Sequence, residues 1–376
     1  MHEPPQRSVD RAERGVRAVG WLAFASPRTL AGLDRRGQEK SFCCKPQAVR
    51  GRPVVMLLTT SSISLYRSCP RAYLHRYEQG IRKRGEKAEA LAFGTAIHAA
   101  LEAYWLGKPE QIEPILFEQL HGEELARARA MLDGYALRWD TDRTEHGLRA
   151  VAVEASFRCP IYDPRTGKRI RGIERAGKVD AIVVDRHGAH WVLEHKTTSS
   201  DVGPGSPYWD RLQVDTQISY YVLGAKTLGY DVAGVIYDVL GKPKISRRLA
   251  TPEAERKYTK EGRLYATQRE VDETIEEYAE RVRAAIAERP ETYYARAEIF
   301  RLEQELTECQ ADDVATIQAM RADRKRGHWP RSTAACYRFG ARCDYLDVCA
   351  GAASIEDSER FEHVGAHTEL TKETSA

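Results

Sequence analysis

The fold of this chain is decided by two neighbouring stretches, GKVDAIVV at residues 177–184 and WVLEHK at residues 191–196. Both are apolar runs of strand length, and the residues between them include a Gly-containing turn signal. They predict a hairpin whose strands lie side by side. Glu194 and Lys196 are two positions apart, so their side chains point to the same face. Asp180 precedes Glu194 by fourteen positions and meets it when the register is right.

This arrangement predicts a metal-dependent site. Asp180 and Glu194 would repel each other, and one would take up a proton unless a cation lay between them. Carboxylate oxygens favour Mg²⁺ or Mn²⁺, and an imidazole such as that of His98 shifts the preference towards Mn²⁺. Such a metal lowers the pKa of a bound water, and Lys196 can orient that water and stabilise developing negative charge. The chemistry is that of phosphodiester hydrolysis.

A simpler interpretation exists for each residue taken alone. Glu-x-Lys pairs are common on solvated strand faces, and a lone histidine such as His98 usually belongs to the core or the surface. Gln217 and Tyr221 lie four apart on an expected helix, where a tyrosine usually packs. The ordered set is what favours a catalytic site.

The flanking sequence completes an α/β pattern with a mixed central sheet. The elements that we expect are helices at 59–77, 88–105, 110–140, 211–228, 252–287 and 311–327, and strands at 151–159, 170–185, 191–196 and 234–240. Residues 56–350 form one folded domain in this interpretation. The acidic residues 351–376 lack an apolar face and are expected to form a flexible tail.

Residues 1–55 show no persistent apolar period and carry eleven Lys or Arg against five Asp or Glu. They are interpreted as a disordered or leader segment, with translation starting at Met56. A basic nucleic-acid arm and an organellar transit peptide are the alternatives.

Bulk composition fits a globular protein, with 42% hydrophobic and 30% charged residues in a 376-residue chain. No apolar run approaches the roughly 18 residues that span a membrane. A cytoplasmic protein of bacterial or phage origin is therefore expected. The net charge of +3 gives no support to DNA binding, which must rest on local basic patches.

Eight cysteines without a secretion signal favour metal or cluster ligation over disulfides. Cys69 stands early, and Cys336, Cys343 and Cys349 lie late in the chain. Four thiolates suit an iron–sulfur cluster or zinc, and spacing does not separate the two.

Several motifs together resemble the PD-(D/E)XK nuclease superfamily, and its RecB-like exonuclease branch most: GTAIH at 94–98, GKVD at 177–180, EHK at 194–196 and QISYY at 217–221. That branch includes the nuclease domains of RecB and AddB, CRISPR-associated RecB-like exonucleases and phage exonucleases. The resemblance implies a restriction-endonuclease-like fold. It also implies specific site residues. The metal ligands would be His98, Asp180, Glu194 and the backbone carbonyl of His195; the catalytic residues would be Asp180, Glu194, Lys196, Gln217 and Tyr221.

The cysteine pattern is similar to that of the AddB-like and CRISPR-associated members, which carry a 4Fe–4S cluster. The resemblance implies that Cys69, Cys336, Cys343 and Cys349 hold such a cluster. It would join the end of the domain to its beginning.

Five basic residues follow Cys69 and alternate with tyrosines: Arg71, Arg76, Arg82, Lys83 and Arg84. They suit single-stranded nucleic acid, with phosphate pairing and base stacking. A solvated helix face over an aromatic core stripe is an equally good interpretation.

The expected activity is a Mg²⁺- or Mn²⁺-dependent DNA exonuclease acting on single strands or DNA ends in recombination, repair or phage DNA processing. One alternative is a CRISPR-associated nuclease that processes spacers. Another is a non-catalytic DNA-end-binding partner of a helicase. No Walker A loop is present, so the chain is not itself a helicase motor.

Overall fold

The computed structural model describes residues 55–85, 89–140, 142, 145, 147–203, 205–338 and 340–370. The chain divides into two units at residue 52, and all described residues belong to the second. The expectations for residues 1–54 therefore lie outside the described residues.

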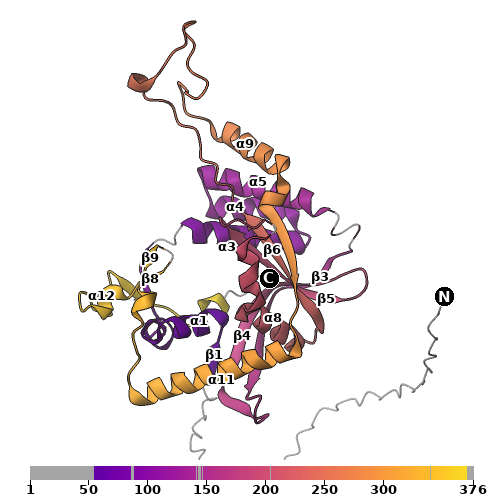
Figure 1. Cartoon of the computed structure of the whole chain (residues 1–376), viewed down its shortest axis with the longest axis vertical. Coiled ribbons are helices and arrows are strands. Elements are labelled where there is room, and N and C mark those ends of the chain that lie inside the picture. The colour runs from indigo at the N-terminus through magenta and orange to yellow at the C-terminus, as the bar shows by residue number, and fades with distance from the viewer. Residues whose placement is uncertain are drawn as a thin grey trace, which may run out of the picture. The chain divides into compact units, whose positions relative to one another are not determined.

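A six-stranded mixed sheet forms the centre of the domain, in the order β1-β4-β5-β6-β7 with β3 also paired to β4 (Figure 1). Strands β3, β4 and β5 are antiparallel neighbours, whereas β5 and β6 run parallel. This confirms the predicted mixed α/β architecture of a central sheet flanked by helices. The strands are β1 (Met56–Leu58), β3 (Arg149–Tyr162), β4 (Arg169–Val184), β5 (His190–Thr198), β6 (Val232–Gly241) and β7 (Tyr294–Ile299).

The sheet buries both faces because the central strands are apolar at successive positions. Ile182 and Val192 pack under helix α8 (Thr216–Thr227). Val183 and Leu193 lie one residue further along their strands and pack on the other face, against the end of helix α3 (Glu89–Trp105).

Helix α8 begins where Asp215 accepts a hydrogen bond from the backbone N–H of Gln217, which satisfies one free donor of the first turn. It lies very close to β3 at Gly224. A Cβ there would come within 2.5 Å of the Phe157 ring, so only glycine permits this approach.

Helix α3 belongs to a helical layer whose apolar faces form a second core. The other helices of that layer are α4 (Ile112–Gln119), α5 (Gly122–Arg138) and α9 (Ile275–Glu288).

The two ends of the folded domain meet. Helix α1 (Thr60–Ser68) starts with a capping box at Thr59, and Pro70 restarts the helix as α2 (Pro70–Tyr73). The long helix α11 (Glu303–Arg326) packs against α1, α8 and β3. Smaller elements complete the chain: a π-helix at Leu74–Glu78, β2 (Ile81–Lys83), α7 (Pro207–Asp210), α10 (Pro290–Tyr293), β8 (Tyr337–Arg338), β9 (Ala341–Arg342), α12 (Leu346–Cys349) and β10 (Phe361–His363).

A buried ion pair fixes α11 to the sheet. Arg175 on β4 is 1% exposed and lies 2.5 Å from Asp313, which is fully buried on α11. Tyr220 of α8 donates a 2.8 Å hydrogen bond to the other oxygen of Asp313. Three elements distant in sequence therefore share one carboxylate.

The prediction of a helix over 252–287 is wrong for most of that range. Only α9 is a regular α-helix there, beginning after a capping box formed by Thr274 and Glu277. The residues before it are polar and mostly exposed, without an apolar face to bury, so no packing stabilises a helix. They project from the domain instead (Figure 1).

Two further segments differ from expectation. Helix α11 begins at Glu303 instead of residue 311, because the Leu302 N–H finds an acceptor in the side chain of Glu305. Part of the expected tail is ordered: β10 pairs antiparallel with β2, and the Phe361 ring is buried and stacks on Tyr345. In the described part of the chain no helix is long and apolar enough to cross a membrane.

Candidate active site

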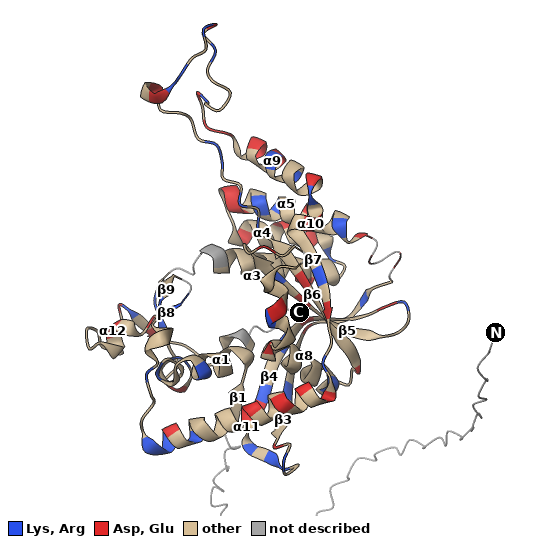
Figure 2. Ribbon diagram, in the orientation of Figure 1, with Lys and Arg blue, Asp and Glu red and all other residues tan. Residues whose placement is uncertain are grey.

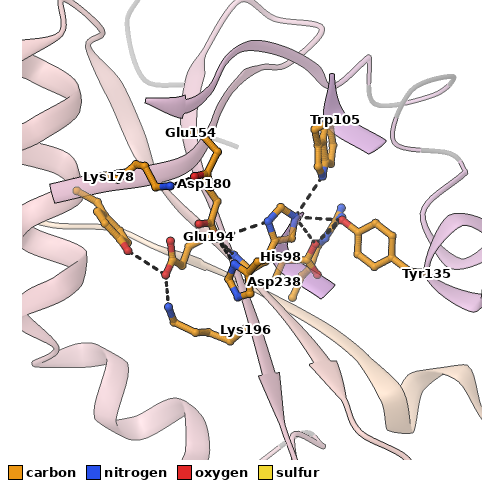
Figure 3. A network of polar contacts seen from close by, with 12 residues as sticks. His98, Trp105, Tyr135, Glu154, Lys178, Asp180, Glu194, Lys196 and Asp238 are labelled. Carbon is orange, nitrogen blue, oxygen red and sulfur yellow. Dashed lines mark hydrogen bonds and ion pairs between the residues drawn. The ribbon is translucent and has the colours of Figure 1, made fainter. Parts of the chain in front are cut away.

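The candidate site lies where β4 and β5 separate. Their pairing runs from Val184 opposite His190 to Ala181 opposite Leu193, and β5 then continues along β6 alone. Asp180 and Glu194 are the next residues on the two strands. Glu194 is 1% exposed, and Asp180 accepts a 2.8 Å hydrogen bond from the His195 backbone N–H (Figure 3).

Helix α8 fixes the position of Glu194. The Tyr221 hydroxyl donates to Glu194 Oε1 at 3.0 Å, and Gln217 Nε2 donates to the Tyr221 oxygen at 2.7 Å. The Lys196 ammonium forms an ion pair with the same Oε1. The structure therefore brings Tyr221 and Lys196 onto the Glu194 carboxylate, with Gln217 behind Tyr221.

His98 approaches from helix α3. Its Nδ1 lies 3.4 Å from Asp180 Oδ2, and 32% of its side chain is exposed. Gly94, one turn earlier, allows this approach, because a Cβ there would come within 3.3 Å of Thr197 on β5.

Burial and nearby charged or hydrogen-bonding groups shift the pKa values of the two carboxyl groups in opposite directions. Burial raises the pKa of Glu194 to about 7, and the negative charge of Asp180 adds to the rise. Burial acts in the same direction on Asp180, yet hydrogen bonds from His195 and His98 hold its pKa well below the usual range. Burial lowers the pKa of Lys196, but Glu194 and Asp180 together raise it above its ordinary value.

The donor set fits a hard divalent cation. Glu194 Oε2 is buried without a hydrogen-bond partner, so a charged oxygen there lacks compensation. Two carboxylates and an imidazole converge on this point. Among the described residues, no three His, Cys, Asp or Glu side chains are arranged to hold an ion as they stand. Lys196 pairs with Glu194 Oε1, so Oε2 is the oxygen of this carboxylate that a cation could take.

The side chain of His195 was missed by the sequence analysis, which used only its backbone carbonyl. Trp105 Nε1 donates to His195 Nε2 at 3.1 Å. That bond makes Nε2 the acceptor and assigns the ring proton to Nδ1, which lies 3.6 Å from Asp180 Oδ2. Tyr135 and Asp238 extend this buried network behind the site (Figure 3). The sequence signal for this role was a histidine at a strand position that faces an apolar helix.

Glu154 was missed as well. It has φ of 51°, the only positive value outside glycine among the described residues. Its carboxylate forms an ion pair with Lys178, and it lines a narrow gap together with His98 and Asp180 (Figure 3). A left-handed conformation costs roughly 1–2 kcal/mol in a non-glycine residue. Strain of this kind is concentrated at functional sites.

All four predicted cluster ligands line one cavity of about 430 Å³. Cys69 ends α1 and begins α2; the others come from the segment around β8, β9 and α12. Burial raises the pKa of Cys343, and charge on Cys69 and Cys336 raises it further. Burial raises that of Cys349 too. Thiolates gathered here would need a cationic centre to neutralise them.

The four arginines among the predicted DNA-binding residues contact the end of the domain. Arg71 donates to the Trp329 carbonyl, Arg76 to that of Gly365 and Arg82 to Thr368; Arg84 contacts Ser358, Phe361 and Glu362. The interleaved tyrosines form a core stripe, since Tyr66 is 6% and Tyr73 2% exposed. These contacts join the beginning of the domain to its end, and DNA binding by the same arginines stays a prediction.

The fold and this constellation define a nuclease. The chain matches the PD-(D/E)XK nuclease superfamily over residues 57–350 and belongs to it. Solved structures similar to it include the following two, and no curated protein matches. A "Putative exonuclease" from Eubacterium rectale is 11% identical, with a TM-score of 0.39 over 84% of this chain and 93% of that one. SSO0001 is 14% identical, with a TM-score of 0.23 over 61% of this chain and 76% of that one.

Proposed function

We propose that this nuclease is a RecB-like, metal-dependent deoxyribonuclease that acts on single-stranded DNA or DNA ends during recombination, repair or phage DNA processing. The observation that carries the proposal is the convergence of β4, β5, α3 and α8 on Asp180 and Glu194. Membership of the superfamily supports hydrolysis of a phosphodiester bond.

Asp180, Glu194 and His98, with the His195 carbonyl, would hold Mg²⁺ or Mn²⁺. A bound ion would lower the pKa of a water and neutralise charge on the scissile phosphate. Lys196 is placed to stabilise negative charge on that phosphate, since its pKa lies above the ordinary value and keeps it protonated. Tyr221, supported by Gln217, holds Glu194 in place.

The test compares the wild-type protein with Glu194→Gln on end-labelled single- and double-stranded DNA, with Mn²⁺ or Mg²⁺. Glu174→Gln is the matched control, because this carboxylate on β4 pairs with Arg169 away from the site. We expect Glu194→Gln to lose at least about 100-fold in cleavage, the usual cost of a group that stabilises the transition state. Equal cleavage by all three proteins would assign the activity to a contaminant. No cleavage by any of them, with DNA bound, would favour the end-binding partner.

The same proposal includes a 4Fe–4S cluster held by Cys69, Cys336, Cys343 and Cys349. The four cysteines all line one cavity of about 430 Å³, which supports it. A zinc site would hold its thiolates at Zn–S distances of about 2.3 Å. The cluster would be structural, because it joins α1 and α2 to the segment that follows α11.

Iron, sulfide and zinc contents of anaerobically purified protein test this. We expect about four iron atoms per chain and visible absorbance, both lost in Cys343→Ser. Cys309→Ser is the control, because Cys309 packs near the sheet core and does not line the cavity. One zinc per chain without iron would overturn the cluster.

A further inference from the structure

The segment between β6 and α9 leaves the sheet next to the candidate active site. Lys196 pairs with Val239, and three residues after Val239 the Lys242 N–H donates to the Thr198 carbonyl at 2.7 Å. The chain then projects beyond α5 and α9 (Figure 1). The projection thus begins at the end of β6, beside the end of β5 that carries Lys196.

The base of the projection is attached to the domain by ion pairs. Lys242 pairs with Glu124, and Arg247 approaches Glu123 and Asp272. Glu273 accepts from Arg281, and Arg269 pairs with Glu277. These pairs attach the projection to α5 and α9.

Its tip, residues 256–265, is different. Lys257, Lys260 and Arg263 are exposed, and no described carboxylate lies within ion-pair distance of them. Tyr258 and Tyr265 are 50% and 48% exposed. Residues 256–265 hold four Lys or Arg and one Glu, so their charge is +3. Figure 2 shows blue segments along this projection.

The tip is nevertheless an organised turn. Tyr258 and Leu264 form a β-bridge, and the Thr259 N–H donates to the Arg263 carbonyl at 2.7 Å. Gln268 accepts from the Lys257 N–H and donates to the Glu255 carbonyl. The unpaired cations and the two rings are therefore presented by a defined backbone.

We infer that this tip is a second DNA contact that holds single-stranded substrate away from the cleavage site. The inference rests on the proposed nuclease function. Unpaired cations suit phosphates, and exposed tyrosine rings suit unpaired bases, which stack on aromatic faces. An acidic protein surface would form ion pairs with the cations, but it would offer no bases on which the tyrosine rings could stack.

Chain length limits where the contact lies. Lys260 is eighteen residues beyond Lys242, which is at most about 60 Å of extended chain. A stacked strand rises about 3.4 Å per nucleotide, so the tip lies within about 18 nucleotides of the catalytic edge. A substrate of about 40 nucleotides can reach it, and the tip adds little for one of about 6.

The first variant removes the three tip cations (Lys257→Ala, Lys260→Ala and Arg263→Ala), and the second removes the rings (Tyr258→Ala and Tyr265→Ala). The control changes the same charge elsewhere: Lys108→Ala, Lys226→Ala and Arg283→Ala. Binding is measured by fluorescence anisotropy without metal, in a Glu194→Gln background, over a range of salt concentrations. Cleavage of 6- and 40-nucleotide strands is measured with Glu194 intact.

We expect the cation variant to lower the slope of log K against log salt by about 2, which is 0.7 for each lost phosphate contact. The ring variant should weaken single-strand binding by at least about 5-fold, from 1–3 kcal/mol per stacked base, and duplex binding much less. Cleavage of the 6-nucleotide strand should stay within about 2-fold of wild type.

A cation variant with the salt slope of the control would overturn the inference, and so would a ring variant that weakens duplex and single strand equally. The two proposals fail separately. If the protein never cleaves DNA but the tip variants lose DNA binding, only the nuclease proposal is refuted. Normal cleavage with unchanged binding would remove only the tip.

Discussion

Replacing Tyr221 by Phe removes one hydroxyl from the candidate site and leaves the buried ring in place. That hydroxyl donates to Glu194 Oε1 at 3.0 Å and accepts from Gln217 at 2.7 Å. A hydrogen bond to a charged group is worth about 1.5–3 kcal/mol. At 1.36 kcal/mol per decade, kcat/KM should fall by about 10- to 150-fold.

The chain supplies a matched control one residue earlier. Tyr220 is equally buried, and its hydroxyl donates at 2.8 Å to Asp313, a structural carboxylate. Tyr220→Phe and Tyr221→Phe should therefore lose similar stability in urea unfolding, about 1–3 kcal/mol each. Only Tyr221→Phe should lose cleavage of end-labelled single-stranded DNA. Activity within 3-fold of wild type in Tyr221→Phe, or equal losses in both, would refute a specific role for the Glu194 contact.

Three further predictions concern the surrounding structure. Asp313→Ala leaves the Arg175 charge buried without its partner and should reduce the free energy of unfolding by about 3–5 kcal/mol in urea, whereas an ordinary surface pair would cost under 1. Hydrogen bonding to Arg281 lowers the pKa of Glu273 to about 2, so its contribution to stability is complete above pH 4.5 and disappears as the pH falls towards 2. Thermal unfolding should show Glu273→Gln less stable than wild type at pH 6 and equal to it near pH 2; a constant difference would contradict this. Glu154→Gly relieves the strain of φ 51° at the cost of a partly exposed ion pair, so stability should change by no more than about 1 kcal/mol while cleavage falls. Unchanged cleavage would show that the strain has no catalytic purpose.

Local pattern was sufficient for the centre of the fold. The two apolar runs on either side of a turn predicted the hairpin, and the pairing of the strands brings Asp180 and Glu194 together. The contact between Gln217 and Tyr221 was also predictable from their spacing, because residues four apart on a helix lie on the same face.

Long-range pairing was beyond the sequence. Arg175 and Asp313 are 138 positions apart, and nothing local marks them as partners. The basic run after Cys69 shows the same limit. Its composition suits DNA, and nothing local shows that Arg82 and Arg84 also contact residues 286 and 277 positions away. Composition shows which chemical groups a segment carries, but it does not show which residues or ligands those groups contact.

The helix prediction for residues 252–274, within this projection, was wrong for a related reason. Its charged residues have good helix propensity, but propensity alone does not hold a helix that has no apolar face to pack. The helix survives only in α9, where Tyr278, Val282 and Ile286 are buried against the helical layer.

The two carboxylates of the site are held by different parts of the fold. Glu194 is fixed by Tyr221 from α8 on one face of the sheet. Asp180 is fixed by the β5 backbone and by His98 of α3, the helix that also packs on the other face through Trp105. Their mutual repulsion, which burial strengthens, therefore acts against two separately anchored helix–sheet contacts. Loosening either helix would let the carboxylates move apart. The packing of α3 and α8 thus bears directly on the chemistry that the site can perform.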